Sequence, residues 1–126
     1  MKTFVLLAMV FMHIADDYYL QGILAQLKQK KWWEKNCPSE MYRNDWKIAL
    51  LEHAFSWTFM MMLPAMAMMI CEKNVCERQF AVLFIANMAV HAITDHMKAN
   101  QEKISLTMDQ CIHLVQILLT WTCIYH

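Results

Sequence analysis

Four apolar runs dominate the sequence, and each of them carries a histidine. In three of the runs an aspartate lies four residues from that histidine. Each run has about twenty residues, enough for a helix to cross a hydrocarbon core of roughly 30 Å. Imidazoles and carboxylates are costly inside such segments, so they need partners and usually serve a purpose. The predicted helices cover residues 3–27, 46–70, 79–99 and 106–125.

The composition favours a membrane protein over a soluble one. The chain has 126 residues, of which 59% are hydrophobic and 17% are charged. A soluble domain of this length needs more polar surface, whereas one domain is all that the length allows. We therefore predict a single all-α domain, residues 1–126, built as a four-helix transmembrane bundle. A soluble four-helix bundle with a very apolar core is the alternative.

The net charge of zero argues against nucleic acid as a general partner. The expected partners are the lipid bilayer and a second copy of the chain, because a chain of this size would need to dimerise to act as a transporter. The aromatic residues Tyr18 and Tyr19 and the tryptophans are predicted to lie at the membrane interface.

The first run begins like a secretory signal peptide, with Lys2 followed by apolar residues. The small-residue cleavage pattern is missing and the apolar character resumes after Asp17, so we interpret it as a retained first helix. The five cysteines contain no CxxC pair, the motif of zinc ribbons and thioredoxins. Cys71 and Cys76 bracket a short loop and would pair only in an oxidising compartment.

Basic residues are distributed unevenly between the predicted loops. The loops after the first and third helices hold eight of them: Lys28, Lys30, Lys31, Lys35, Arg43, Lys47, Lys98 and Lys103. The opposite side holds three: Lys2, Lys73 and Arg78. The positive-inside rule then predicts an integral protein of the inner or plasma membrane, with these two loops in the cytoplasm and both termini outside.

The ionisable residues within the runs fall at one depth, near the predicted cytoplasmic side. Three helices carry a histidine and an aspartate four residues apart, on one face: His13 and Asp17, His91 and Asp95, and, in reverse order, Asp109 and His113. His53 stands alone about two turns into the second helix. Independent core polar groups have no reason to share a depth, so we predict one site.

Imidazole and carboxylate donors together suit zinc, manganese or iron. The predicted ligands are His13, Asp17, His53, His91, Asp95, Asp109 and His113. Seven donors would satisfy two metal ions, or one ion with carboxylates that orient the histidines. Gln21, Lys98 and Gln110 are predicted to support the ligands or to contact substrate. Asp16 and His96 are each one residue from a ligand, which on a helix turns them about 100° away from it.

The sequence resembles a small bacterial and phage family of multi-pass membrane proteins, the domain of unknown function DUF 3307. The similarity rests on four motifs in order: His13-x-x-x-Asp17-Tyr18-x-x-Gln21, His53 in the second run, His91-x-x-x-Asp95-x-x-Lys98 and Asp109-Gln110-x-x-His113. The chain departs from the family in Tyr18, where Phe is usual, and in the additional acid Asp16. The resemblance implies a helical membrane bundle with these polar positions, and it implies no established activity.

Three functions fit this pattern. The first is a metal-dependent hydrolase at the cytoplasmic leaflet, in which the metal activates water and Asp17 or Asp95 acts as general base. The second is a metal-ion or proton transporter or channel. The third is a non-catalytic bacterial or phage membrane partner in which the polar cluster only holds the helices together. Lys98 either binds a lipid phosphate or extends to the interface as lysines near helix ends commonly do.

Overall fold

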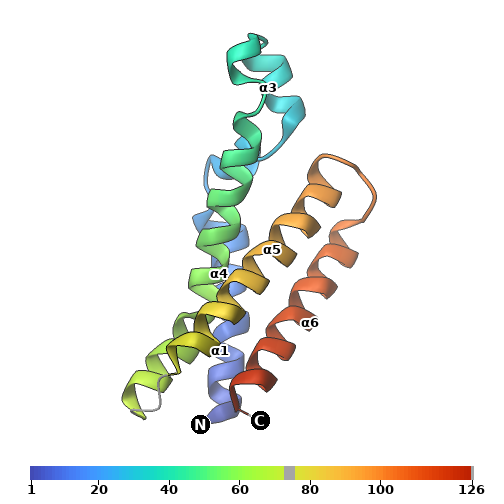
Figure 1. Cartoon of the computed structure of the whole chain (residues 1–126). Helices are drawn as coiled ribbons and strands as arrows, with labels where there is room; N and C mark the ends of the chain where they lie inside the picture. Colours follow the sequence, from blue (N-terminus) through green and yellow to red (C-terminus); the bar gives the residue numbers. More distant parts are fainter. Residues whose placement is uncertain (73–75, 126) are drawn as a thin grey trace.

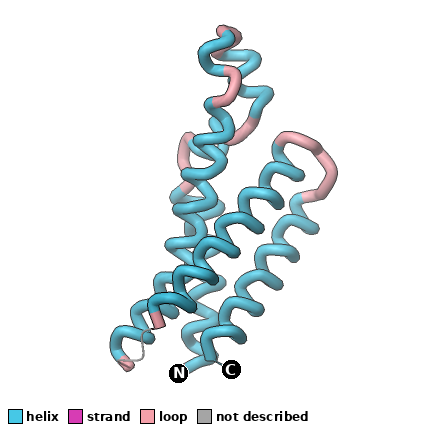
Figure 2. The backbone as a smooth tube through the Cα atoms, in the orientation of Figure 1, coloured by secondary structure: helices cyan, strands magenta, loops and turns pink. Residues whose placement is uncertain are grey.

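The computed structural model describes residues 1–72 and 76–125, and nearly all of them are helical (Figure 2). The elements in order are α1 (Lys2–Ala15), the π-helix η1 (Asp16–Leu20), α2 (Leu24–Leu27), α3 (Lys30–Asn36), the 3-10 helix η2 (Glu40–Tyr42), α4 (Asp45–Cys71), α5 (Glu77–Ala99) and α6 (Leu106–Tyr125). No strand occurs in these residues, so the all-α prediction is confirmed.

The four long helices pack side by side in a ring, because α4 contacts both α1 and α5, and α6 contacts both α5 and α1 (Figure 1). The two ends of the chain meet at one end of this ring. There the Lys2 ammonium donates to the Tyr125 carbonyl at 3.0 Å, and the Trp121 indole donates to the Lys2 carbonyl at 3.0 Å. At the other end α4 extends beyond α5 and α6 and is accompanied by α3.

The hydrophobic core lies in the half of the ring nearer the termini. Its members come from three helices and are Val5, Met9, Trp57, Met61, Met62, Ala65 and Ile117. Met61 and Met62 are fully buried, so part of the methionine-rich stretch of α4 fills the core. An unbranched thioether side chain adapts well to irregular gaps of this kind.

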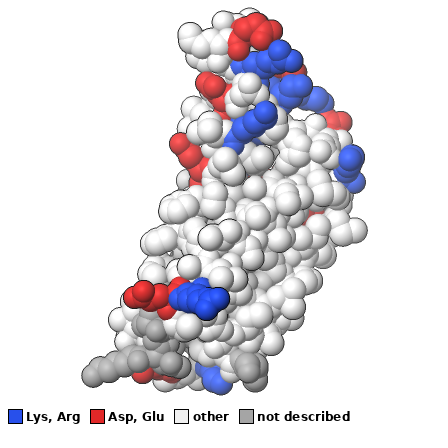
Figure 3. Space-filling view, in the orientation of Figure 1, with Lys and Arg blue, Asp and Glu red and all other residues white. Residues whose placement is uncertain are grey.

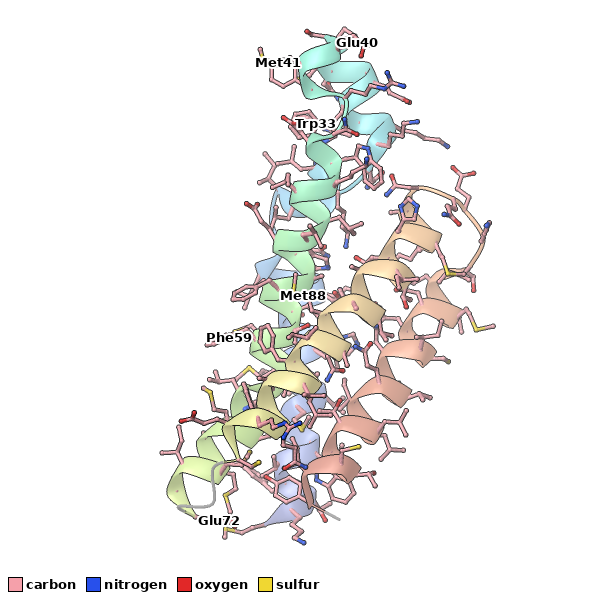
Figure 4. The ribbon with its side chains drawn as sticks, in the orientation of Figure 1. Trp33, Glu40, Met41, Phe59, Glu72 and Met88 are labelled. Carbon is pink, nitrogen blue, oxygen red and sulfur yellow. The ribbon has the colours of Figure 1, made fainter. Side chains whose placement is uncertain are left out.

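Within the described residues, three helical segments are long and apolar enough to cross a membrane: Lys2–Leu20, Glu40–Cys71 and Glu77–Ala99. Figure 3 shows a broad uncharged band between charged residues gathered toward the two ends. Figure 4 places Glu40 and Glu72 at opposite ends of the molecule and Phe59 on the outside of α4 between them. This architecture is compatible with membrane insertion.

The fourth predicted span, α6, is not among the three. Its 20 residues suffice for a bilayer in length, but several strongly polar residues lower its hydropathy: Asp109, Gln110, His113 and Gln116. Two of these, Asp109 and His113, are fully buried inside the ring. The hydropathy of α6 is therefore set partly by its contribution to the interior, whereas its outer face carries exposed Leu118 and Leu119.

The prediction of one continuous helix over residues 3–27 is wrong in its last third. The helix widens into η1 after Ala15, and the chain then turns at Gly22, whose φ is +50°. Glycine has no Cβ and adopts positive φ at little cost, so the lone glycine stands where the helix must stop. The other three predicted helices agree with α4, α5 and α6 to within two residues.

Two smaller expectations concern the loop between α4 and α5. Lys73, which contributes to the predicted charge difference, lies outside the described residues. Cys71 and Cys76 are free and exposed.

The first loop, between α2 and α4, is more structured than predicted, because α3 and η2 occupy much of it. The Ser39 hydroxyl accepts a hydrogen bond from the Met41 backbone amide at 3.4 Å.

We expect Gly22→Ala to lower the free energy of unfolding by about 1 kcal/mol. The added Cβ has room, since its nearest neighbour would be the Leu20 carbonyl oxygen at 3.8 Å, so the cost arises from the backbone angle. Gly22→Asn should cost less, because asparagine tolerates positive φ. Denaturant unfolding in detergent measures both variants. Equal losses would mean that the backbone angle is not the cause.

Candidate metal centre

The structure places all seven predicted ligands in one cluster between the four long helices. His13, His53, His91, His113, Asp95 and Asp109 are each at most 1% exposed, and Asp17 is 8% exposed. Regular helical turns bring each i, i+4 pair to the inner face of α5 and α6. The cluster lies beside α4, toward the C-terminal ends of α1 and α5 and the N-terminal end of α6. It is therefore between the hydrophobic core and the loops after α2 and α5.

The π-helix η1 adds Asp16 to the cluster, a carboxylate that was predicted to point away from it. The backbone N–H of Gln21 donates to the backbone carbonyl of Asp16, five residues earlier, at 3.0 Å. This turn therefore holds one residue more than an α-helical turn. As a result both Asp16 and Asp17 face inward, and Asp16 is fully buried. Asp16 accepts a hydrogen bond from the Ser56 hydroxyl at 2.7 Å and lies 3.9 Å from His53 Nδ1.

Three imidazoles form a contiguous row. His91 Nε2 lies 3.1 Å from His53 Nε2, and His91 Nδ1 lies 3.3 Å from His113 Nδ1. Each nitrogen–nitrogen contact needs either a proton on one partner or a cation shared by both lone pairs. Two nitrogens bound to one tetrahedral zinc at roughly 2.0–2.1 Å are about 3.3 Å apart, so the spacing suits metal ligands.

Asp95 is the hub of the carboxylates. Its Oδ2 lies 3.2 Å from His53 Nε2 and 3.8 Å from His91 Nε2, and its Oδ1 lies 3.6 Å from His113 Nε2. Asp17 Oδ1 is 3.5 Å from His53 Nε2, and Asp109 Oδ1 is 3.5 Å from His113 Nε2. Every imidazole of the row therefore has at least one carboxylate within ion-pair distance.

Two groups of three side chains within this cluster could hold a metal ion. One is Asp17, His53 and His91, the other is His91, Asp95 and His113, and in each group the ligand atoms lie within 4.8 Å of one another. His91 belongs to both. The remaining two predicted ligands, His13 and Asp109, lie beside these groups and belong to neither.

His13 is held by other partners. The Trp57 indole, which can only donate, donates to His13 Nδ1 at 2.7 Å. His13 Nε2 therefore carries the proton and donates to Gln110 Oε1 at 3.1 Å. Both ring nitrogens are thus used in hydrogen bonds, which explains why His13 supports the cluster without offering a free lone pair.

Trp57 is a site residue that the sequence analysis missed, since the tryptophans were expected at the interface. Its side chain is fully buried, and its ring stacks on His91 with centroids 4.2 Å apart and an interplanar angle of 16°. Trp57 follows His53 by one helical turn, so the i, i+4 spacing that identified the other pairs would also have placed it on the inner face.

The predicted supporting residues behave differently from one another. Gln110 donates to Asp17 Oδ2 at 3.3 Å and to Asp109 Oδ2 at 3.1 Å, which links the two carboxylates. The Gln21 side-chain Nε2 donates to the backbone carbonyl of Asp17. His96 stacks on Trp46 with ring centroids 5.2 Å apart, outside the cluster as predicted.

Two lysines balance part of the negative charge. Lys98 Nζ lies 2.6 Å from Asp109 Oδ2, and Lys28 Nζ lies 2.5 Å from Asp95 Oδ2. Lys28 is only 7% exposed, so its assignment to a solvated basic loop is wrong. The turn at Gly22 and the short helix α2 return the chain toward the ring, and nothing in the local sequence separates this lysine from its basic neighbours.

Several buried polar atoms in the cluster have no hydrogen-bond partner. They are Asp16 Oδ2, His53 Nδ1, Asp109 Oδ1 and His113 Nε2. An unpaired buried polar group costs about 1–3 kcal/mol, so native proteins rarely leave several together. The four atoms form two oxygen–nitrogen pairs, Asp16 Oδ2 with His53 Nδ1 at 3.9 Å and Asp109 Oδ1 with His113 Nε2 at 3.5 Å, and a proton or a cation would satisfy each pair. His53 and His113 each belong to one of the two groups of ligands, whereas Asp16 and Asp109 belong to neither.

A second polar layer joins α5 to α6 one turn further toward the termini. Asn87 Nδ2 donates to Thr120 Oγ1 at 2.8 Å, and Gln116 Nε2 donates to the Asn87 carbonyl at 2.7 Å. This layer was not predicted from the sequence, although Asn87 precedes His91 by four residues and Gln116 follows His113 by three. Both spacings place the layer on the same helix faces as the cluster.

A partly open cavity of about 150 Å³ borders the cluster. Its lining residues are Asp17, Tyr18, Gln21, Lys28, Lys98, Leu106 and Gln110. Asp17 is therefore the carboxylate of the predicted ligand set that lines an opening to the outside. Three of the other lining residues, Lys28, Lys98 and Gln110, contact the cluster carboxylates directly.

Comparisons with protein-family models, with characterised proteins and with solved structures find no match to this chain. The resemblance to the DUF 3307 family consequently stays a prediction. The candidate site is defined by the geometry of the chain itself.

We expect Lys28→Met to lower the free energy of unfolding by about 3 kcal/mol, because it leaves the Asp95 carboxylate buried without its cation. The double variant Lys28→Met with Asp95→Asn should lose less than the sum of the two single changes. Unfolding in detergent without added metal measures this coupling. Lys30→Met is the matched control, since Lys30 is exposed, and a loss as large as that of Lys28→Met would contradict the ion pair.

Proposed function

We propose that this chain is an integral membrane protein that binds a divalent metal ion in its histidine–aspartate cluster and hydrolyses a substrate at the cytoplasmic leaflet. The observation that carries the proposal is the pair of buried donor groups sharing His91. Zinc is the favoured ion, and manganese or iron would accept the same mixed donors.

The charge of the cluster supports a divalent ion. With neutral imidazoles, four carboxylates and two ammonium groups leave two negative charges in the cluster: Asp16, Asp17, Asp95 and Asp109 against Lys28 and Lys98. Such a charge is not stable when buried, and one divalent cation neutralises it. Two protons on the imidazoles would have the same effect, which is the basis of the alternative below.

We assign the ligands to His91, Asp95 and His113. Three protein ligands with one open position are the usual arrangement of catalytic zinc, which lowers the pKa of a bound water. Asp95 is held in place by Lys28, and His91 by the stacked Trp57 ring. Asp17 borders the cavity and is left to accept a proton from water as general base.

The proposed orientation places the loops after α2 and α5 in the cytoplasm, with both termini outside, as the basic residues predict. A hydrogen bond and an ion pair join the start of α3 to the segment after α5. The Lys30 amide donates to Asn100 Oδ1 at 2.6 Å, and Lys31 pairs with Glu102. The hydrogen bond to Glu102 raises the pKa of the exposed Lys31.

We expect detergent-purified protein to carry one zinc, manganese or iron ion per chain, measured by elemental analysis. Asp95→Asn and His91→Ala should lose the ion, and His96→Ala should keep it, because His96 lies outside the cluster. Asp95→Asn should also lose stability, because it leaves Lys28 buried without its carboxylate, so the metal content and not the stability is the readout for this variant. A protein that stays metal-free after zinc addition would overturn the proposal and favour a purely structural cluster.

The row of three imidazoles favours one alternative, a proton relay. Contacts of 3.1 and 3.3 Å allow a proton to pass from His53 to His113 through His91, and histidine changes charge near neutral pH. Under the metal proposal we expect no proton flux into proteoliposomes when a pH gradient is imposed and followed with a trapped dye. Flux in the natural protein that is lost in His91→Ala would favour the relay.

A further inference from the structure

We propose that the cavity beside the cluster binds a phosphate monoester, and that the substrate is a lipid bearing this group. The inference rests on the proposed function, because Asp17, the proposed general base, lines the cavity together with Lys28, which pairs with the proposed ligand Asp95. It extends that function by naming the chemical class of the substrate.

Two lysines give the cavity its preference for an anion. Lys28 and Lys98 both line it, and each ammonium group makes one short contact with a carboxylate. An ammonium group has three donors, so each lysine keeps donors for a further acceptor. Phosphate oxygens are strong acceptors for such charged donors.

The cavity is also built for a polar occupant. Gln21 Oε1 is buried there without a hydrogen-bond partner. Gln110, which also lines the cavity, donates to both Asp17 and Asp109 and so holds these two carboxylates in place. An unpaired amide oxygen needs a donor, so a water molecule or a hydroxyl of the ligand, and not the phosphate oxygens, would occupy the space beside Gln21.

Size and surroundings select a lipid. A volume of about 150 Å³ is well below the roughly 300–1,000 Å³ of pockets that enclose whole small molecules, so the cavity would enclose a terminal group only. Tyr18 and Leu106 line the same cavity and are each 55% exposed. In the proposed orientation these apolar side chains face the lipid at head-group depth, where the rest of a lipid substrate would lie.

The charges require the metal to bind first. Without it the cluster carries surplus negative charge beside the cavity, which repels a phosphate. In the reaction, a water oxygen attacks phosphorus while Asp17 takes its proton. The phosphorus–oxygen ester bond then breaks, and the departing lipid alkoxide receives that proton, which leaves an alcohol and inorganic phosphate.

The test uses zinc-loaded protein in a neutral detergent, titrated with dioctanoyl phosphatidic acid, dioctanoylglycerol and inorganic phosphate in a calorimeter. We expect phosphatidic acid to bind and dioctanoylglycerol, which lacks the phosphate, not to bind. Leu106→Trp should weaken phosphatidic acid binding at least about tenfold by filling the mouth. Met108→Trp is its matched control, because Met108 is 54% exposed on the same helix and does not line the cavity.

A second pair of variants tests the charge. Lys98→Gln should weaken phosphatidic acid binding about tenfold, whereas Lys103→Gln, which changes an exposed lysine in the loop after α5, should leave it unchanged. Zinc content, measured in every sample, separates the two levels of the proposal. Failure to bind zinc overturns the proposed function, whereas zinc-loaded protein that binds no phosphatidic acid overturns this inference alone. Inorganic phosphate binding as tightly as the lipid would support the phosphate site and overturn the lipid as its source.

Discussion

The burial of four carboxylates between apolar helices is the constraint on which this structure depends. An isolated carboxylate in such an interior is too costly to persist, so each one has acquired a counter-charge or donor. Asp95 has Lys28, Asp109 has Lys98, Asp16 has the Ser56 hydroxyl and Asp17 has Gln110. The four imidazoles complete this shell. While they are neutral, two negative charges remain, which a divalent cation or two protons on the imidazoles would balance.

The irregular backbone of the first helix follows from the same requirement. A regular α-helix through residues 15–27 would turn Asp16 away from the interior and carry Lys28 away from Asp95. The wide turn of η1 brings both Asp16 and Asp17 inward, and Gly22 then allows the chain to bend back with Lys28. These two departures from helical geometry thus both bring charged side chains into the cluster. Single π-helical turns are frequently found at functional sites.

The sequence could predict what depends on regular periodicity. The apolar runs predicted the positions of α4, α5 and α6, and the i, i+4 pairs predicted which side chains meet. Asp16 and Lys28 were missed because their positions depend on a π-turn and a glycine bend that are set by tertiary contacts and not by local pattern. Trp57 was missed for a different reason, since tryptophan in a membrane helix is usually found at the interface, and only its spacing from His53 indicated otherwise.

The distribution of charged residues around the cluster favours the proposed reaction site over a proton path across the membrane. On the side of the cavity, Asp17 and two lysines lead from the cluster to the outside. On the opposite side lie the fully buried Met61 and Met62, and the only polar layer described there is that of Asn87, Gln116 and Thr120. None of these three side chains titrates, so a proton that reached His113 would find no further acceptor among them. A second cavity, of about 260 Å³, borders this layer and is lined mainly by apolar side chains, so the two sides differ in their charged residues, which line the cavity beside Asp17 and not this one.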